Sequence, residues 1–122
     1  MKFNDTLNLD RFIEIMNAQQ YPWFGTNAEK DEIVDNKSFF IYSKEGRIEK
    51  ATNSHNQYLQ EFTLAFITRE NSQVNVLQLS DQLAKARLIF RNSDSEEGKF
   101  AETDEDTKMT TMTFVHVIKA CE

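Results

Sequence analysis

The residues best suited to chemistry lie near the C-terminus, where seven carboxylates fall between Asp94 and Asp106 against one lysine. A metal-dependent nuclease needs acidic ligands together with a lysine beside the scissile phosphate. Such sites draw their ligands from separate elements, whereas these carboxylates share one local segment. The stretch "DSEEG" also lacks the alternating oxygen ligands and the distant glutamate of a calcium loop. We therefore predict no metal.

Two interpretations of this acidic segment stay open. The first is a solvated hairpin whose charges discourage unwanted pairing at a sheet edge. The second is a patch with a purpose, such as repelling phosphates or docking a basic partner. The turn "TDEDT" is of the kind that aspartate favours.

The remaining reactive side chains predict no catalytic set. Cys121 is the single cysteine, so it forms no intrachain disulfide, and its place next to the last residue does not favour a nucleophile. The two histidines, His55 and His116, are too distant in sequence to suggest a zinc site. A histidine within a strand is more often packed or hydrogen-bonded than a base. We predict no catalysis and no cofactor, with an enzyme as the alternative if His116 and carboxylates converge in a pocket.

The bulk composition predicts a small single domain, residues 1–122, with a thin core. Hydrophobic residues make up 39% of the 122 residues, which suits one sheet with a helix layer. The net charge of −6 and the scattered cations argue against a protein that grips DNA. No apolar run approaches the ~20 residues of a membrane span. The N-terminal "MKFNDTLNLDRF" predicts no secretory signal. We expect a soluble protein of a reducing compartment.

Two stretches have helical periodicity. A helix over 8–20 is predicted by one apolar stripe, with Asn8 or Thr6 as its cap. A second helix over 74–91 is predicted by apolar residues repeating every three or four positions. The two stripes are Leu9, Phe12, Ile13 and Met16, and Val76, Leu79, Leu83, Ala86 and Phe90.

Alternation with period two predicts two long strands, 58–69 and 107–119, in the same sheet. "KSFFIYSK" and "KFAETD" are also typical of strands, while 26–36 is expected to be irregular. The predicted fold is α+β, with a mainly antiparallel four-stranded sheet packed against two principal helices. Its expected core residues are Phe62, Phe66, Leu83, Phe90 and Phe114. Apolar residues on both faces of the last strand suggest cover from another subunit.

The segment "YPWFG" places three aromatic residues directly after the first helix. Tyr21, Trp23 and Phe24 have two interpretations: a hydrophobic lid over the core, or an exposed anchor for a partner. Their position after a helix end favours the lid, and the anchor stays as the alternative.

The order of the elements carries a family resemblance. A strand "YLQEFTLAFITRE" is followed at once by "NSQVNVLQLSDQLAKARLIF" and then by "FAETDEDTKMTTMTFVHVI". From about residue 7 to 119 the chain resembles the small tail-terminator proteins of long-tailed bacteriophages. These proteins are also called tail-completion, head–tail joining or minor capsid proteins.

The resemblance implies a structural virion protein without catalysis. It implies a hexameric ring that caps the tail tube, contacts the tail-tube protein and the head-connector (stopper) protein, and lets DNA pass without specific binding. Such a protein is assembled in the cytoplasm of the host bacterium and resides in the tail or neck of the virion, with no membrane contact. We expect four acidic residues at the ring lumen or rim: Glu102, Asp104, Glu105 and Asp106. The alternative function is a small intracellular adaptor or inhibitor.

Overall fold

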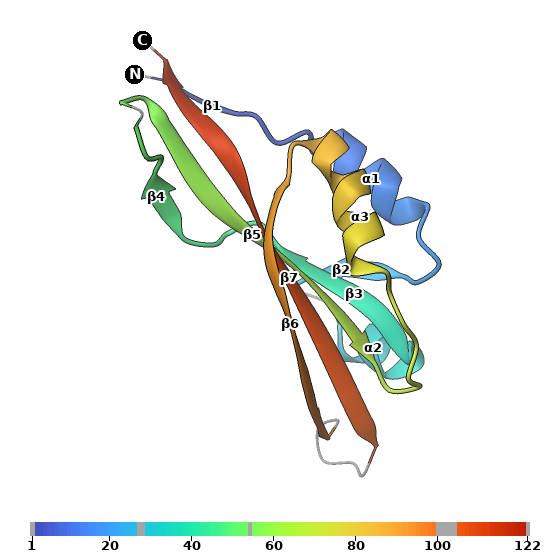
Figure 1. Ribbon diagram of the computed structural model, residues 1–122. Helices are drawn as coiled ribbons and strands as arrows, with labels where there is room; N and C mark the ends of the chain where they lie inside the picture. Colours follow the sequence, from blue (N-terminus) through green and yellow to red (C-terminus); the bar gives the residue numbers. More distant parts are fainter. Residues whose placement is uncertain (1, 27–28, 54, 100–104, 122) are drawn as a thin grey trace.

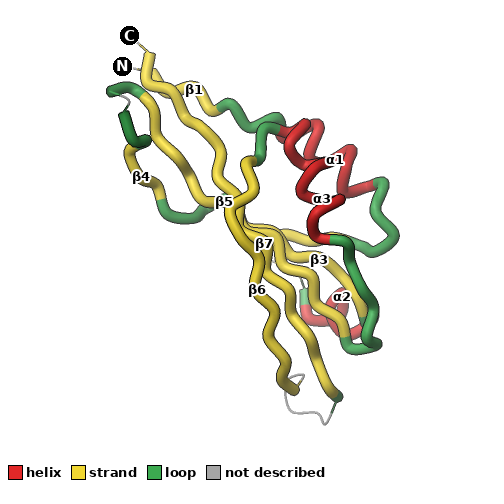
Figure 2. Tube along the Cα trace, in the orientation of Figure 1, coloured by secondary structure: helices red, strands yellow, loops and turns green. Residues whose placement is uncertain are grey.

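The protein folds as an α+β unit with one mixed, curled seven-stranded sheet shaped like a half-barrel (Figures 1 and 2). The computed structural model describes residues 2–26, 29–53, 55–99 and 105–121. The strands are β1 (Lys2–Asp5), β2 (Trp23–Gly25), β3 (Ser38–Ser43), β4 (Ile48–Lys50), β5 (Gln57–Thr68), β6 (Ile89–Lys99) and β7 (Asp106–Cys121). The helices are α1 (Leu9–Asn17), α2 (Lys30–Asp35) and α3 (Val76–Leu83), followed by a 3₁₀ turn over Ala84–Ala86.

Two long central strands organise the sheet. β5 and β7 pair antiparallel from Gln57 opposite Lys119 to Thr68 opposite Lys108. The outer edge of β7 is taken by β6 along one half and by β1 along the other, and β3 and β4 divide the outer edge of β5 in the same way. β2 continues the sheet beyond β3 in a parallel pairing, which makes the sheet mixed.

The prediction that 58–69 and 107–119 lie in one sheet is confirmed, and the predicted number of four strands is wrong. The three additional strands include β1 and β4, which have only four and three residues. Strands this short carry almost no periodic signal, and their positions are fixed by distant partners. β1, for example, pairs with the far end of the chain. The predicted irregular stretch 26–36 contains the short helix α2.

Both principal helices begin where an asparagine caps them. The Asn8 side-chain oxygen accepts a hydrogen bond from the backbone N–H of Arg11 at 3.0 Å, and that of Asn75 accepts one from Gln78 at 3.0 Å. Each bond satisfies one of the free N–H groups of the first turn. The cap at Asn8 is one of the two that the sequence predicts.

The predicted helix over 74–91 is too long. α3 ends at Leu83, and the backbone turns at Arg87, which has a positive φ of 70°. This left-handed conformation ends a helix and is uncommon for a residue other than glycine. Strand β6 then begins at Ile89, so Phe90 belongs to a strand and its apolar spacing from Leu83 is coincidental.

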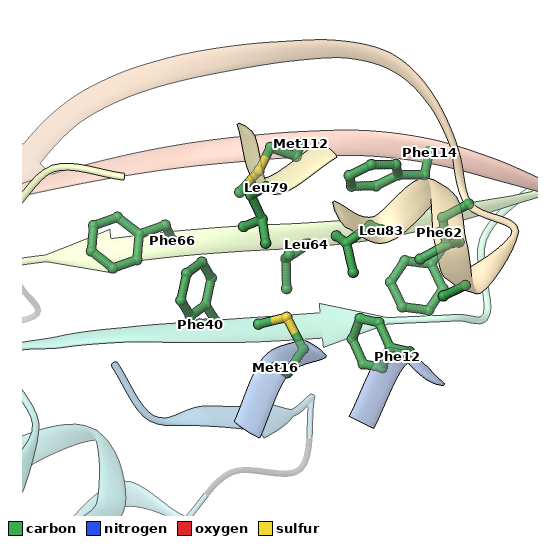
Figure 3. Close-up of a cluster of buried hydrophobic side chains, with 12 residues drawn as sticks. Phe12, Met16, Phe40, Phe62, Leu64, Phe66, Leu79, Leu83, Met112 and Phe114 are labelled. Carbon is green, nitrogen blue, oxygen red and sulfur yellow. The ribbon is translucent and has the colours of Figure 1, made fainter. Parts of the chain in front are cut away.

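The core lies between the sheet and the pair α1 and α3, which cover the same face (Figures 1 and 3). The strand residues that fill it alternate along β5 and β7, as predicted: Phe62, Leu64, Phe66, Met112 and Phe114. Of the five predicted core residues, four are buried, and Phe90 is half-buried beside Phe114 with ring centroids 5.7 Å apart. Together these aromatic and aliphatic side chains supply the main stabilisation of the fold.

The opposite face of the sheet is covered differently. Phe39 points away from α1 and α3, since it is adjacent to the core residue Phe40, yet it is buried against Phe24. Nearby, the Arg69 guanidinium donates hydrogen bonds to the carbonyls of Ile33, Val34 and Asn36 at 2.9–3.1 Å. These bonds tie the C-terminal end of α2 to the end of β5 and satisfy carbonyls that the helix leaves free.

Candidate functional site

The acidic segment is built on the β6–β7 hairpin, which projects from the body of the molecule beyond the helices (Figure 1). β6 pairs antiparallel with β7 down to Lys99 opposite Asp106. All residues of β6 except Phe90 are exposed. The stretch 92–99 is therefore a regular strand without an apolar face, because this part of the sheet extends past the core.

Pairing divides the hairpin carboxylates between the two faces of the sheet. Glu97 lies opposite Lys108, and Asp106 forms an ion pair with Lys99 at 2.5 Å on the face shared with the helices. Asp94 and Glu96 lie on the other face, opposite the neutral residues Thr111 and Met109. Each cross-strand ion pair at such exposed positions contributes ~1 kcal/mol or less.

Repulsion within the hairpin is small enough to be tolerated. Asp94 and Glu96 are two residues apart on one strand face, ~7 Å, where two charges in water repel by about 0.6 kcal/mol. Salt with a screening length of ~8–10 Å reduces this further. The hairpin thus presents an exposed acidic surface at little cost to the fold.

The described carboxylates form no metal site. Among the described residues, no group of three or more histidine, cysteine, aspartate or glutamate side chains could hold a metal ion. Of the four residues predicted for the lumen or rim, Glu105 and Asp106 are described and exposed. Glu102 and Asp104 lie outside the described residues, so the complete patch stays a prediction.

His116 forms the one buried histidine–carboxylate pair of the described chain. Its Nδ1 lies 2.7 Å from Oδ1 of Asp5, and its side chain is 1% exposed, while that of Asp5 is 46% exposed. Since a carboxylate oxygen only accepts, Nδ1 carries the hydrogen of this bond. Nε2 is buried with no hydrogen-bond partner, and the ring stands edge-on to Phe62 at 6.4 Å.

This arrangement suits a structural histidine. A general base must reach the proton that it takes, directly or through one water, and the free Nε2 is enclosed. Asp106 is ten positions from His116 on β7, ~33 Å along the strand, so the hairpin carboxylates do not converge on the imidazole. The pair holds the end of β1 in place, because Asp5 also accepts a hydrogen bond from the backbone N–H of Leu7 at 2.9 Å.

Of the three aromatic residues after α1, Tyr21 and Trp23 pack against the core, and Phe24 packs against Phe39 on the opposite face of the sheet. Tyr21 lies against Phe66 with centroids 5.0 Å apart, and Trp23 stands edge-on to Phe12 at 5.8 Å. The Trp23 indole N–H donates to Asn17 Oδ1 at 2.9 Å. All of Tyr21, Trp23 and Phe24 keep some exposed surface. Tyr21 and Trp23 form the predicted lid over the core, whereas Phe24 lies on the other face of the sheet. The role of the three residues as a partner anchor stays a prediction.

Asp5 is the hydrogen-bond partner of His116 that the sequence did not predict. It stands 111 positions from His116, and a single carboxylate in a polar N-terminal stretch carries no signal. The isolated histidine in an otherwise apolar strand was the available indication, because a buried imidazole needs a hydrogen-bond partner.

Comparison with known proteins adds no relative: the sequence matches no protein-family model and no curated protein. Among the described residues, no helix is long and apolar enough to cross a membrane.

Proposed function

We propose that the protein is a structural virion protein of a long-tailed bacteriophage. In this proposal, copies of the chain assemble into a ring, expected to be a hexamer, that caps the tail tube and joins it to the neck of the head. The ring contacts the tail-tube protein on one side and the head-connector protein on the other. It has no catalytic role.

The observation that carries the proposal is the one-sided cover of the central strands. α1 and α3 lie on one face of β5 and β7 (Figure 1), and the other face keeps half-buried apolar residues toward its two ends. Leu59 pairs with Val117 at one end and Ile67 with Met109 at the other. Each of the three pairs between them includes a polar residue: Glu61 with Val115, Thr63 with Thr113 and Ala65 with Thr111. Sheets with apolar residues on both faces are normally covered on both. A neighbouring copy is the cover that we propose.

The acidic hairpin supports the same function. Its exposed carboxylates suit a wall that DNA must pass without sticking, because like charges keep the duplex from binding. The hairpin also projects, so copies around an axis would bring several such hairpins together. In this proposal Glu102, Asp104, Glu105 and Asp106 lie at the lumen or rim.

The proposal is tested by the mass of the assembled protein. Sedimentation and native mass spectrometry of the purified protein, alone and mixed with the tail-tube protein of the same genome, are expected to give a closed oligomer that stops tube growth. Negative-stain images of the mixture should show rings at one tube end. A protein that stays monomeric or dimeric and leaves tube polymerisation unchanged would contradict the proposal and favour the adaptor alternative.

A further inference from the structure

The widest part of the sheet ends in two free edges at the same level. The pairing runs from Ser95 to Thr110, then to Phe66, Phe40 and Trp23, and so crosses the strands β6, β7, β5, β3 and β2. Within the described residues, β6 and β2 each pair on one side only. An edge strand carries unpaired N–H and C=O groups that can pair with another chain.

We propose that β6 of one copy pairs with β2 of the next, so that the sheet continues from copy to copy. The inference rests on the proposed ring and names its interface. The occupant of the β6 edge is a second copy of this chain, because the same chain offers a complementary free edge on the other side of the sheet.

The strand directions suit this pairing. β7 and β3 are both antiparallel to β5, so they run in the same direction, and β2 is parallel to β3. β6 is antiparallel to β7. When two copies stand side by side in the same orientation, β2 of one therefore runs antiparallel to β6 of the other. The helix layers of the two copies then lie on the same side of the shared sheet.

Charge disfavours the simpler pairing of β6 with β6, since three of the five charged residues of β6 are carboxylates. A two-fold contact between two β6 edges would bring Asp94, Glu96 and Glu97 of each copy close to the same residues of the other, and like charges opposite each other destabilise a sheet. β2 reads Trp-Phe-Gly and has no charge. The acidic edge therefore favours a head-to-tail contact, which closes into a ring or runs on as an open chain.

Side-chain size adds to the match. With both strands at the same level, the small residues Ser95 and Ser93 lie across from Trp23 and Gly25 of the neighbouring copy. Trp23 and Phe24 are only partly buried within their own copy. The pairing would cover the remaining surface of these two rings, which is the partner contact that the sequence analysis keeps as the alternative to a lid.

Cysteine scanning tests the pairing directly. In a Cys121→Ser background, Thr26→Cys, directly after β2, is combined with one cysteine at Asn92, Ser93, Asp94 or Ser95. These positions on β2 and β6 are separated by four strand spacings within one copy, ~19 Å, so only an intermolecular disulfide can form. We expect the yield of crosslinked oligomers to alternate along β6, highest at Asn92→Cys and Asp94→Cys, which share the face of Thr26. The matched control, Thr26→Cys with Asn4→Cys on the β1 edge, should give no such pattern.

Proline substitution supplies the second measurement. Successive backbone N–H groups of an edge strand point alternately toward the paired strand and outward. One of the two variants Asp94→Pro and Ser95→Pro therefore removes an N–H group that points outward from β6. The other removes an N–H group that bonds β6 to β7. The outward variant should keep the native melting temperature and weaken association about tenfold or more. The other should lower the melting temperature.

The outcomes separate the interface from the ring. Alternating crosslinks in a closed oligomer support both, and alternating crosslinks in open chains of variable length support the pairing and overturn the ring. A closed ring without alternation, or with association unchanged in both proline variants, overturns the pairing and leaves the ring. A protein that sediments as a monomer at every concentration tested overturns both.

Discussion

Strand β7 passes through a covered and an exposed environment, and the comparison shows how position along the sheet decides whether its residues are buried. In its middle, β7 alternates between half-buried residues and the fully buried Met112, Phe114 and His116, beneath α1 and α3. At its start, Asp106 is exposed and pairs with Lys99 of the equally exposed β6. Backbone pairing runs through both regions, with one irregularity in β6 between Phe90 and Asn92. The cover of the helices, and not the backbone hydrogen bonding, therefore distinguishes the region that stabilises the fold from the exposed region.

The largest expected effect is in the covered region. Phe114→Ala removes a fully buried ring and should lower the free energy of unfolding by about 3–5 kcal/mol. Glu96→Ala in the hairpin is the matched control and should change it by about 0.5 kcal/mol or less. Urea denaturation of both variants measures the difference. Equal effects would show that the hairpin contributes to the core as much as the covered region does.

The two regions were not equally predictable. The alternation of Phe62, Leu64 and Phe66 gave the buried face of β5 correctly, because one side of that strand faces the helices. In β6 both faces are exposed, so residues 92–99 show no alternation. The end of α3 was missed because Arg87 takes a conformation that glycine normally marks. Local patterns thus identify elements that bury one face, and long-range pairing decides the others.

A second pair of variants compares two of the three glycines, Gly46 and Gly98. A Cβ atom at Gly46 would lie 2.5 Å from the backbone oxygen of Glu61, whereas one at Gly98 in the hairpin meets no atom within 4 Å. Gly46 also donates its N–H to that oxygen at 3.2 Å, at the point where β3 gives way to β4. Gly46→Ala must therefore push backbone apart.

We expect Gly46→Ala to cost about 1–3 kcal/mol of unfolding free energy and to loosen β4. Gly98→Ala should leave stability unchanged or slightly higher, because alanine loses less conformational freedom on folding. Thermal melts and amide exchange at β4 measure both. A neutral Gly46→Ala variant would mean that β4 can move away from β5 without loss.

A third variant concerns the other end of β7, where the N-terminal strand is held by Asp5. Asp5→Ala leaves the buried Nδ1 of His116 without its acceptor, a local cost of about 1–3 kcal/mol. Since β1 is a short terminal strand, we expect β1 to detach from β7, which avoids most of that free-energy cost. Amide exchange should become faster at Thr6, whose N–H bonds the carbonyl of Val117, while β5 stays protected. Lys2→Ala, at the exposed start of β1, is the control. Unchanged exchange at Thr6 would show that β1 is held without the pair.

We expect the smallest effect on stability from removing the charges of the acidic turn. The proposed function predicts that the same change has the largest effect on the retention of DNA. Replacing Glu102 and Glu105 by Gln, and Asp104 and Asp106 by Asn, removes four negative charges from the acidic segment. The ion pair of Lys99 with Asp106, which this variant loses, joins side chains that are 61% and 89% exposed. Its contribution is ~0–1 kcal/mol, and the loss is offset because neighbouring carboxylates no longer repel.

The melting curve of this fourfold variant should therefore overlay that of the parent protein, and the ring should keep its mass. In a six-fold ring the change removes twenty-four negative charges, four from each copy, so a duplex in the channel would no longer meet a like-charged wall. We expect nonspecific retention of DNA to rise at low salt and to fall again as salt screens the duplex. A control variant with the same number of carboxylates removed elsewhere, at Glu14, Glu45, Glu49 and Asp81, should retain less. Equal retention by both variants would assign the effect to net charge and remove the acidic turn from the channel.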